Sequence, residues 1–354
     1  MQVLKKWLAC VLAGSIVLCG AAAVSAESAT RLGDVNNDGY INNKDLSRMK
    51  QYLADDLTQI VFDATDMNKD GRINNKDYAR LKKYLADPDM LRNGWVEENG
   101  KTYYYVDDVA LTGHQLIDGV RYQFNENGVL TSFVGIDVSG FQGEIDWEAV
   151  KADGVDYVMI RAGYRGDTSG NLFEDSYFEQ NLRGAYAAGL ECGVYFFSQS
   201  VTVEEAEQEA DFVLELLRKV PECKLSYPVA YDMEASADPD ARTADPSITN
   251  QLRTDMASAF CDKIKDAGYI TCIYSNKNWF EEKLDLETLR NRYDLWVAHW
   301  TQEVTPFTPF TQWQYTSEGS VAGINGAVDR NICTFDYARH QTDSITYHEW
   351  SPIY

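Results

Sequence analysis

The larger, C-terminal part of this 354-residue chain alternates between two hydrophobic patterns. From Phe133 onward, short apolar runs bounded by turn residues are separated by longer stretches with an apolar residue every three or four positions. The short runs are typical of buried strands, and the longer stretches are typical of amphipathic helices. Their alternation predicts an α/β barrel.

The pattern predicts eight strands and four main helices. The strands cover residues 134–137, 157–161, 193–197, 229–231, 270–274, 295–298, 310–314 and 327–329. The helices cover residues 147–152, 177–188, 203–219 and 247–267. Because the later connections are too short for full helices, the barrel is expected to be irregular.

Polar and aromatic side chains gather where these strands end. They are Asp137, Arg161, Tyr195, Asp232, Glu234, Tyr274, Trp300, Gln314 and Asp329. In barrels, active sites are built at the carboxyl ends of the strands. One such residue alone is more often structural, but several carboxylates among aromatic rings that stack on sugars favour a carbohydrate cleft.

Two of these carboxyls lie in the sequence Tyr-Asp-Met-Glu at 231–234. Side chains of a strand alternate between faces, so Asp232 and Glu234 are expected to point the same way and Met233 the opposite way. Carboxyls that are close together resist double ionisation, so one keeps its proton while the other stays charged. Glycosidic bond cleavage needs both forms. A cleft bounded by Tyr231 and Trp300 would raise the pKa of Glu234, which makes it the expected acid.

A twelve-residue pattern occurs twice near the start of the chain, at 34–45 and at 66–77, and each copy continues into a helical pattern. Oxygen ligands at loop positions 1, 3, 5 and 12, a backbone carbonyl at 7 and glycine at 6 suit calcium. The predicted ligands are Asp34, Asn36, Asp38, Tyr40 and Asp45 in the first loop, and Asp66, Asn68, Asp70, Arg72 and Asp77 in the second. Two structural calcium ions are expected.

Position 12 is aspartate rather than the glutamate of an EF-hand, and no helix precedes either loop. With these features the segment 32–88 resembles a type I dockerin, a small all-α calcium-binding module. The resemblance implies binding to a cohesin domain of a scaffold protein. It also implies that loop positions 10 and 11 help to select the cohesin, here Asn43, Lys44, Asn75 and Lys76.

Aromatic residues and Asn-Gly or Asp-Gly turns alternate over residues 94–131, which predicts β-hairpins. This segment resembles two copies of the choline- or glucan-binding type of cell-wall repeat. The second copy departs from that family, because Gly113-His114 stands where Gly-Trp is expected. Binding to a wall glycan and a purely structural hairpin spacer therefore both remain open.

Several motifs of the barrel region occur in a characteristic order. They are Gly-Ile-Asp-Val-Ser-Gly-Phe-Gln-Gly at 135–143, Ile-Asp-Trp at 145–147, Met-Ile-Arg-Ala-Gly-Tyr at 159–164, Tyr-Asp-Met-Glu at 231–234, Gln-Trp-Gln-Tyr at 312–315 and Val-Asp at 328–329. With them, residues 133–340 resemble glycoside hydrolase family 25, the muramidase-type lysozymes. The resemblance implies cleavage of the β-1,4 bond between N-acetylmuramic acid and N-acetylglucosamine in peptidoglycan, with no catalytic cofactor.

Carried over by position, the resemblance makes Glu234 the proton donor and Asp232 the carboxylate that orients the acetamido group of the substrate. Asp137 and Asp329 fill the other two acidic positions. The expected substrate-binding residues are Arg161, Tyr195, Tyr231, Tyr274, Trp300 and Gln314. The alternatives are a hydrolase of another acetamido-sugar polymer, such as chitin, and a glycan-binding protein without catalytic activity.

Composition adds the cellular context. A basic start and an apolar run ending in Val-Ser-Ala predict a signal peptide at 1–26, and hence a secreted protein. No later stretch is apolar enough to span a membrane. The formal net charge of −23 disfavours nucleic acid as a partner. Residues 341–354 form a tail without a usable motif.

Overall fold

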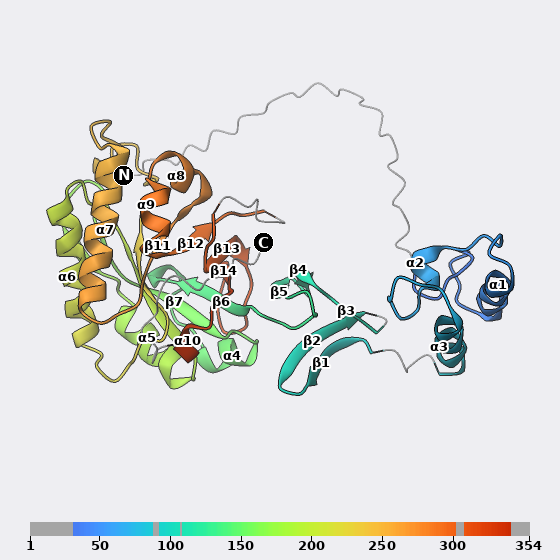
Figure 1. Ribbon diagram of the computed structural model, residues 1–354. Helices are drawn as coiled ribbons and strands as arrows, with labels where there is room; N and C mark the ends of the chain where they lie inside the picture. Colours follow the sequence, from blue (N-terminus) through green and yellow to red (C-terminus); the bar gives the residue numbers. More distant parts are fainter. Residues whose placement is uncertain (1–30, 88–91, 107, 302–307, 341–354) are drawn as a thin grey trace, which may run out of the picture. The chain divides into compact units, whose positions relative to one another are not determined.

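The structure is a computed structural model that describes residues 31–87, 92–106, 108–301 and 308–340 (Figure 1). The predicted signal peptide and the tail at 341–354 lie outside these residues. The chain divides into two compact units, Met1–Leu91 and Arg92–Tyr354. Each unit is described by itself below.

The N-terminal unit contains two loop-helix repeats. Its helices are α1 (Asn43–Ala54), the short α2 (Phe62–Thr65) and α3 (Asn75–Ala86). The two long helices begin with the same capping box, in which the side chain of Asn42 or Asn74 caps the first turn and an aspartate three residues later bonds back. Met49 of α1 and Leu81 of α3 are fully buried in this small unit. The predicted repeat of loop and helix is thus present, and α2 adds one turn between the copies.

The second unit begins with the predicted hairpins. Strands β1 (Gly94–Glu98), β2 (Lys101–Val106) and β3 (Val109–Ala110) form an antiparallel sheet, and β4 (Gly113–Ile117) pairs with β5 (Val120–Phe124). Asn99-Gly100 and Asp118-Gly119 form the tight turns, where all four residues have positive φ angles between 50° and 80°. Such turns favour asparagine, aspartate and glycine, which explains why the hairpins could be predicted from the sequence.

Eight strands close into a barrel in the rest of this unit, as predicted. In order around the barrel they are β6 (Phe133–Val138), β7 (Tyr157–Arg165), β9 (Glu191–Phe197), β10 (Val229–Asp232), β11 (Thr271–Asn276), β12 (Asp294–Ala298), β13 (Gln312–Gly319) and β14 (Val328–Cys333). The first seven run parallel. The last strand, β14, is antiparallel to both β13 and β6. The short β8 (Leu172–Glu174) pairs only with β7.

The helices that cover the barrel are unevenly distributed (Figure 1). The first strands are followed by α4 (Trp147–Ala152), α5 (Phe178–Ala187), α6 (Val203–Arg218) and α7 (Asn250–Asp266), and the later ones only by α8 (Lys277–Glu282), α9 (Leu286–Arg290) and α10 (Tyr337–His340). Among the described residues that link β12, β13 and β14, none is helical. The barrel is therefore irregular, as the short connections predicted.

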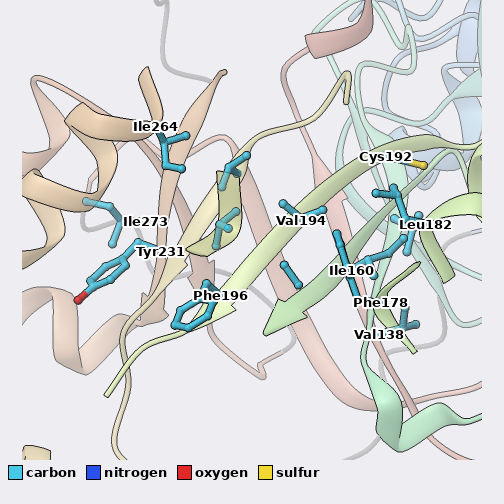
Figure 2. Packing of buried hydrophobic residues seen from close by; sticks show 14 of the residues in the cluster. Val138, Ile160, Phe178, Leu182, Cys192, Val194, Phe196, Tyr231, Ile264 and Ile273 are labelled. Carbon is cyan, nitrogen blue, oxygen red and sulfur yellow. The ribbon is translucent and has the colours of Figure 1, made fainter. Parts of the chain in front are cut away.

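The main core lies between the strands and the long helices. Figure 2 shows part of it, where Ile160, Val194 and Phe196 lie on the strands and Phe178 and Leu182 come from α5. A second cluster includes Tyr157 of β7 and Trp296 of β12, together with Tyr227 just before β10 and Tyr337 of α10. With apolar groups on both faces, the strands form a rigid base for the residues at their ends.

Candidate active site

A cleft of about 710 Å³ opens at the carboxyl ends of the parallel strands. Among its lining residues are Asp137, Phe141, Arg161, Tyr164, Tyr195, Asp232, Glu234, Tyr274, Trp296, Trp300, Gln314 and Asp329. All nine strand-end residues singled out in the sequence lie in this lining. The structure therefore brings them into one cleft.

Strand β10 delivers the central pair of carboxyls. Asp232 is the last residue of β10, and Glu234 follows two positions later, so both side chains line the cleft. Met233 lies between them and packs into the core on the other side. Pairing with β9 and β11 on both flanks fixes this geometry. The alternation expected from the sequence is present.

Tyr231 corrects one prediction. Its side chain is fully buried, packs against Phe260 with ring centroids 4.8 Å apart, and bonds through its hydroxyl to Ser198 and Ser200. It points into the core (Figure 2) and does not line the cleft. The reason is the same alternation that turns Met233 inward, because Tyr231 is directly adjacent to Asp232 in β10 and therefore faces the opposite side of the strand.

The remaining two carboxyls come from opposite ends of the sequence. Asp137 near the end of β6 is paired in register with Asp329 near the start of β14. The sequence predicted that Asp329 ends its strand at 329, whereas β14 begins at Val328 and runs on to Cys333. Because β14 is antiparallel, its start lies at the rim where the other strands end. The predicted direction of this strand was wrong, but the carboxyl of Asp329 still lies in the cleft as predicted.

Asp137 is held by two side-chain amides. Gln314 donates from Nε2 to Oδ2 of Asp137 at 2.9 Å, and Asn331 donates from Nδ2 to the same oxygen at 2.7 Å. The amide oxygen of Gln314 accepts from Tyr274 Oη and Trp300 Nε1, both at 3.0 Å. These bonds fix the orientation of the Gln314 amide, and through it the position of the carboxylate.

Asn331 and Trp296 are site residues that the sequence reasoning missed. Trp296 lines the cleft and donates from Nε1 to Oδ1 of Asn331 at 2.8 Å, which orients the amide that holds Asp137. A signal was present, since Asn331 lies two residues beyond Asp329 and the period of a strand places both on one face.

Burial raises the pKa of all four carboxyls, and repulsion from neighbouring carboxylates adds to the rise for Glu234, Asp137 and Asp232. Burial, followed by the charge of Asp329, raises the pKa of Glu234 to about 7. Burial raises the pKa of Asp329 to about 6. The pKa values of Asp137 and Asp232 are also well above the ordinary range, first because of burial and then because of neighbouring carboxylates. The cleft therefore retains protons near neutral pH.

Asp232 carries an unsatisfied oxygen. Its Oδ1 is buried and has no hydrogen-bond partner, although the positive charge of Arg161 lowers the pKa of this carboxyl and partly offsets the effect of burial. Arg161 is itself fixed by Asp175, to which Nε donates at 2.7 Å. A buried acceptor without a donor is costly, so this oxygen is suited to an N–H group of a bound ligand.

A smaller hollow of about 370 Å³ adjoins the cleft and shares Glu234, Tyr274 and Trp300 with it. Asn276, Lys277 and His299 are among its other lining residues. Glu234 therefore borders two open spaces, which suits a group that donates a proton to an atom bridging two parts of a ligand.

The two N-terminal loops have nearly the same geometry. In the first, both carboxylate oxygens of Asp34 accept backbone N–H groups, from Asp38 at 3.0 Å and Gly39 at 2.8 Å. Asp45 accepts from Asn36 at 3.2 Å and from Asn42 at 2.9 Å. Asp66 and Asp77 make the equivalent bonds in the second loop. All four aspartates are at most 4% exposed.

Residues 136–324 match glycosyl hydrolases family 25, and this match covers more than half of the chain. The chain belongs to glycosyl hydrolases family 25. Residues 32–86 match the dockerin type I domain, which identifies the N-terminal unit as a dockerin.

The family 25 domain is similar to proteins of known activity. Lysozyme M1 of Streptomyces globisporus is 29% identical over 202 residues, which are 56% of this chain and 66% of that protein. The autolytic lysozyme of Clostridium acetobutylicum is 27% identical over 197 residues, 55% of this chain and 54% of that protein. The chain thus spans between about half and two thirds of the length of these relatives.

Among solved structures, the modular autolysin LytC from Streptococcus pneumoniae has a TM-score of 0.53 with this chain. The two are 27% identical, and the match covers 67% of this chain and 57% of that chain. This likeness agrees with the irregular barrel of the family 25 domain. No helix among the residues described is long and apolar enough to cross a membrane.

The donor set of the dockerin loops suits calcium. Carboxylates, asparagine amides and a backbone carbonyl at the expected positions are hard oxygen ligands, which suits calcium. In the described part of the chain, no group of three or more His, Cys, Asp or Glu side chains is arranged to hold a metal ion. The fit therefore rests on the mixed set of oxygen donors in each loop and on the burial of its aspartates.

Proposed function

We propose that this protein is a secreted peptidoglycan hydrolase that cleaves the β-1,4 bond between N-acetylmuramic acid and N-acetylglucosamine. The observation that carries the proposal is Glu234, a carboxyl with a pKa raised to about 7 that lies between two open spaces of the cleft. Membership of family 25 and similarity to two lysozymes support it.

Glu234 acts as the proton donor in this proposal. A general acid is most effective when its pKa lies near the working pH, because it is then protonated and still gives up its proton readily. The burial of Glu234 and the repulsion from Asp329 provide that condition. Its proton passes to the glycosidic oxygen as the bond from that oxygen to the anomeric carbon breaks.

Asp232 acts on the acetamido group of the substrate. Its buried, unpaired Oδ1 accepts the amide N–H, which turns the acetamido oxygen toward the anomeric carbon. That oxygen forms a bond to the carbon as the leaving oxygen departs, and water later opens the cyclic intermediate with Glu234 as base. Such assistance by the substrate departs from the usual scheme of two carboxylates. Asp137 and Asp329 supply negative charge beside the positively charged sugar.

Asp232→Asn is expected to lower kcat about 10²- to 10³-fold, the usual cost of removing one well-placed polar group from such a site. The asparagine side chain reduces the charge that supports the developing positive charge on the acetamido group. Steady-state hydrolysis of soluble glycan strands measures the effect. Asp167→Asn is the control, since Asp167 lines the same cleft but bonds to Ser236 at its rim. Equal losses in both variants would remove the special role of Asp232.

Activity is expected to fall about tenfold per pH unit above pH 7, because Glu234 must be protonated. Because the pKa of Glu234 is raised to about 7, its protonated form predominates below pH 7 and is lost above it. With an ordinary pKa of 4.5, only roughly 3% of this carboxyl would be protonated at pH 6. A profile of kcat/KM from pH 5 to 9 tests this, and constant activity up to pH 9 would contradict it.

Mass spectrometry of fragments released from purified peptidoglycan tests the bond specificity. Muropeptides with reducible N-acetylmuramic acid ends are expected. Reducible N-acetylglucosamine ends would assign the other glycosidic bond. Release of fragments from chitin alone would redirect the proposal to a different acetamido-sugar polymer, and tight binding without new ends would assign a glycan-binding protein.

The dockerin is proposed to attach this hydrolase to a cohesin domain outside the cell. Two calcium ions would be held by the loop oxygens of residues 34–45 and 66–77. Asn43, Lys44, Asn75 and Lys76 lie in the first turns of α1 and α3, and they would form the cohesin-binding surface. The predicted signal peptide at 1–26 supports export, and the match to the dockerin type I domain supports scaffold attachment.

A further inference from the structure

One flank of the barrel lacks a covering helix. Along β13, Gln312 and Gln314 alternate with Trp313 and Tyr315, and Gln314 lines the cleft. The rings of Trp313 and Tyr315 therefore face away from the cleft, where helices cover the other strands. Since the described links around β13 contain no helix, another element must cover these rings. They are nevertheless 0% and 5% exposed.

The hairpin β4–β5 covers this flank. The ring of His114 lies edge-on to Trp313 with centroids 5.8 Å apart. The guanidinium of Arg121 lies 5.1 Å from the ring centroid of Trp313 and 5.6 Å from that of Tyr315. Stacking of this kind stabilises a desolvated arginine. His114, which departs from the wall-binding repeat, thus serves a contact inside this unit.

Arg121 also reaches the segment that carries Trp300. Its Nη2 donates to the backbone carbonyl of Thr301 at 3.1 Å. Two residues earlier, the carbonyl of His299 accepts from Trp313 Nε1 at 2.7 Å. Trp300 lies between these two fixed carbonyls.

The position of Trp300 in the cleft depends on such support. Its side chain is exposed, lines both the cleft and the adjoining hollow, and donates to Gln314, which in turn holds Asp137. An exposed ring has few packing neighbours to fix it. Its orientation therefore depends on the backbone on either side.

We propose that Arg121 is a positioning residue for the active site, and that the hairpin Gly113–Phe124 is a brace that fixes Trp300 through the carbonyl of Thr301. The two faces of β5 then have separate roles. Arg121 faces the barrel, whereas Tyr122 contacts Trp95 of the first sheet, with centroids 4.8 Å apart. The proposal rests on the proposed function for its kinetic consequences, but not for its structural ones.

Arg121→Met is the first test, because methionine keeps an apolar stem over Trp313 and removes the donor to Thr301. We expect kcat/KM on soluble glycan strands to fall about ten- to a hundredfold, as for other small displacements of positioned groups. Arg121→Lys, which keeps a positive donor, should recover part of the loss. Arg92→Ala is the matched control, since Arg92, just before β1, bonds to Glu98 of β1 and to Asp108 between β2 and β3. That control should leave kcat/KM unchanged.

A double-mutant cycle separates positioning from general destabilisation. If Arg121 acts through Trp300, Arg121→Met should have little further effect on kcat/KM once Trp300→Ala is present. A merely structural role predicts that the two losses multiply. Full multiplication of the effects would overturn the proposal.

Fluorine NMR of the full chain labelled with 5-fluorotryptophan gives a test that needs no activity. Trp300→Phe assigns the resonance of Trp300. Arg121→Met should shift or broaden that resonance, and Arg92→Ala should not. An unchanged Trp300 resonance in Arg121→Met would overturn the brace. If Arg121→Met shifts the Trp300 resonance but the wild-type protein releases no fragments from peptidoglycan, the brace is supported and the proposed function is refuted.

Discussion

Replacing Glu234 by glutamine is expected to leave the protein folded and to reduce peptidoglycan hydrolysis to background. The amide has nearly the same shape but no proton to give, and general acid catalysis alone contributes about 10²- to 10⁴-fold. Release of reducing ends from purified peptidoglycan measures the loss. Glu215→Gln, an exposed substitution on α6, is the matched control and should retain full activity. Turnover by Glu234→Gln close to that of the wild type would refute the assignment.

Thermal unfolding at pH 8 shows whether the loss is chemical. The pKa of Glu234 is raised from 4.5 to about 7 in the folded state, so the stability it contributes is present below 4.5 and lost as the pH rises through 7. At pH 8 the wild type thus buries an unfavourable charge that the glutamine removes. The variant should melt at least as high as the wild type. A lower melting temperature would mean that misfolding explains the lost activity.

Removing calcium is expected to unfold the dockerin and to leave the family 25 domain folded. Burying four aspartates in two short loops is costly unless a cation compensates their charge, so the free energy of metal binding contributes to folding. Hydrogen exchange on the full chain measures this, because amides of α1 and α3 should lose protection in EDTA and regain it with calcium. Amides of α6 should not change.

Asp45→Asn provides the residue-level test of the same idea. It should raise the calcium concentration needed to protect α1, while Asp55→Asn, at the C-terminal cap of that helix, should not. Because Asp45 also bonds to the N–H of Asn42, part of its effect is loss of a helix cap. Equal protection of α1 and α3 with and without calcium would refute the calcium sites.

The sequence predicted those parts of the site that depend on near neighbours. The dockerin loops could be predicted because the proposed ligands of each loop fall within twelve consecutive residues. The pairing of Asp232 and Glu234 could be predicted because the alternation of side chains along one strand places both in the cleft. The same alternation places Tyr231 on the opposite face of the strand. Tyr231 was predicted to line the cleft because it is an aromatic residue next to the carboxyls, and this prediction was wrong.

What remained hidden depends on pairing across long distances in the chain. The direction of β14 follows from its register with β6 and β13, which no local pattern encodes. Asn331 shares a strand face with Asp329, but its role in the site depends on bonds to Trp296 of β12 and Asp137 of β6. The contact from Arg121 to Thr301 spans 180 residues, and Arg121 on its own reads as an ordinary exposed position of a hairpin.

The hairpin β4–β5 covers Trp313 and Tyr315, and this limits where the chain can be cut to make fusion proteins. A fusion point near residue 132, where the sequence suggests the end of a repeat, would separate two aromatic rings from the hairpin that shields them. The product would expose an apolar patch, prone to association, on the flank of its barrel. A junction at Leu91–Arg92 keeps the hairpin and the barrel together, because both belong to the unit Arg92–Tyr354. Replacement of the dockerin is therefore expected to leave the family 25 domain intact only when Arg92–Tyr354 is kept as one piece.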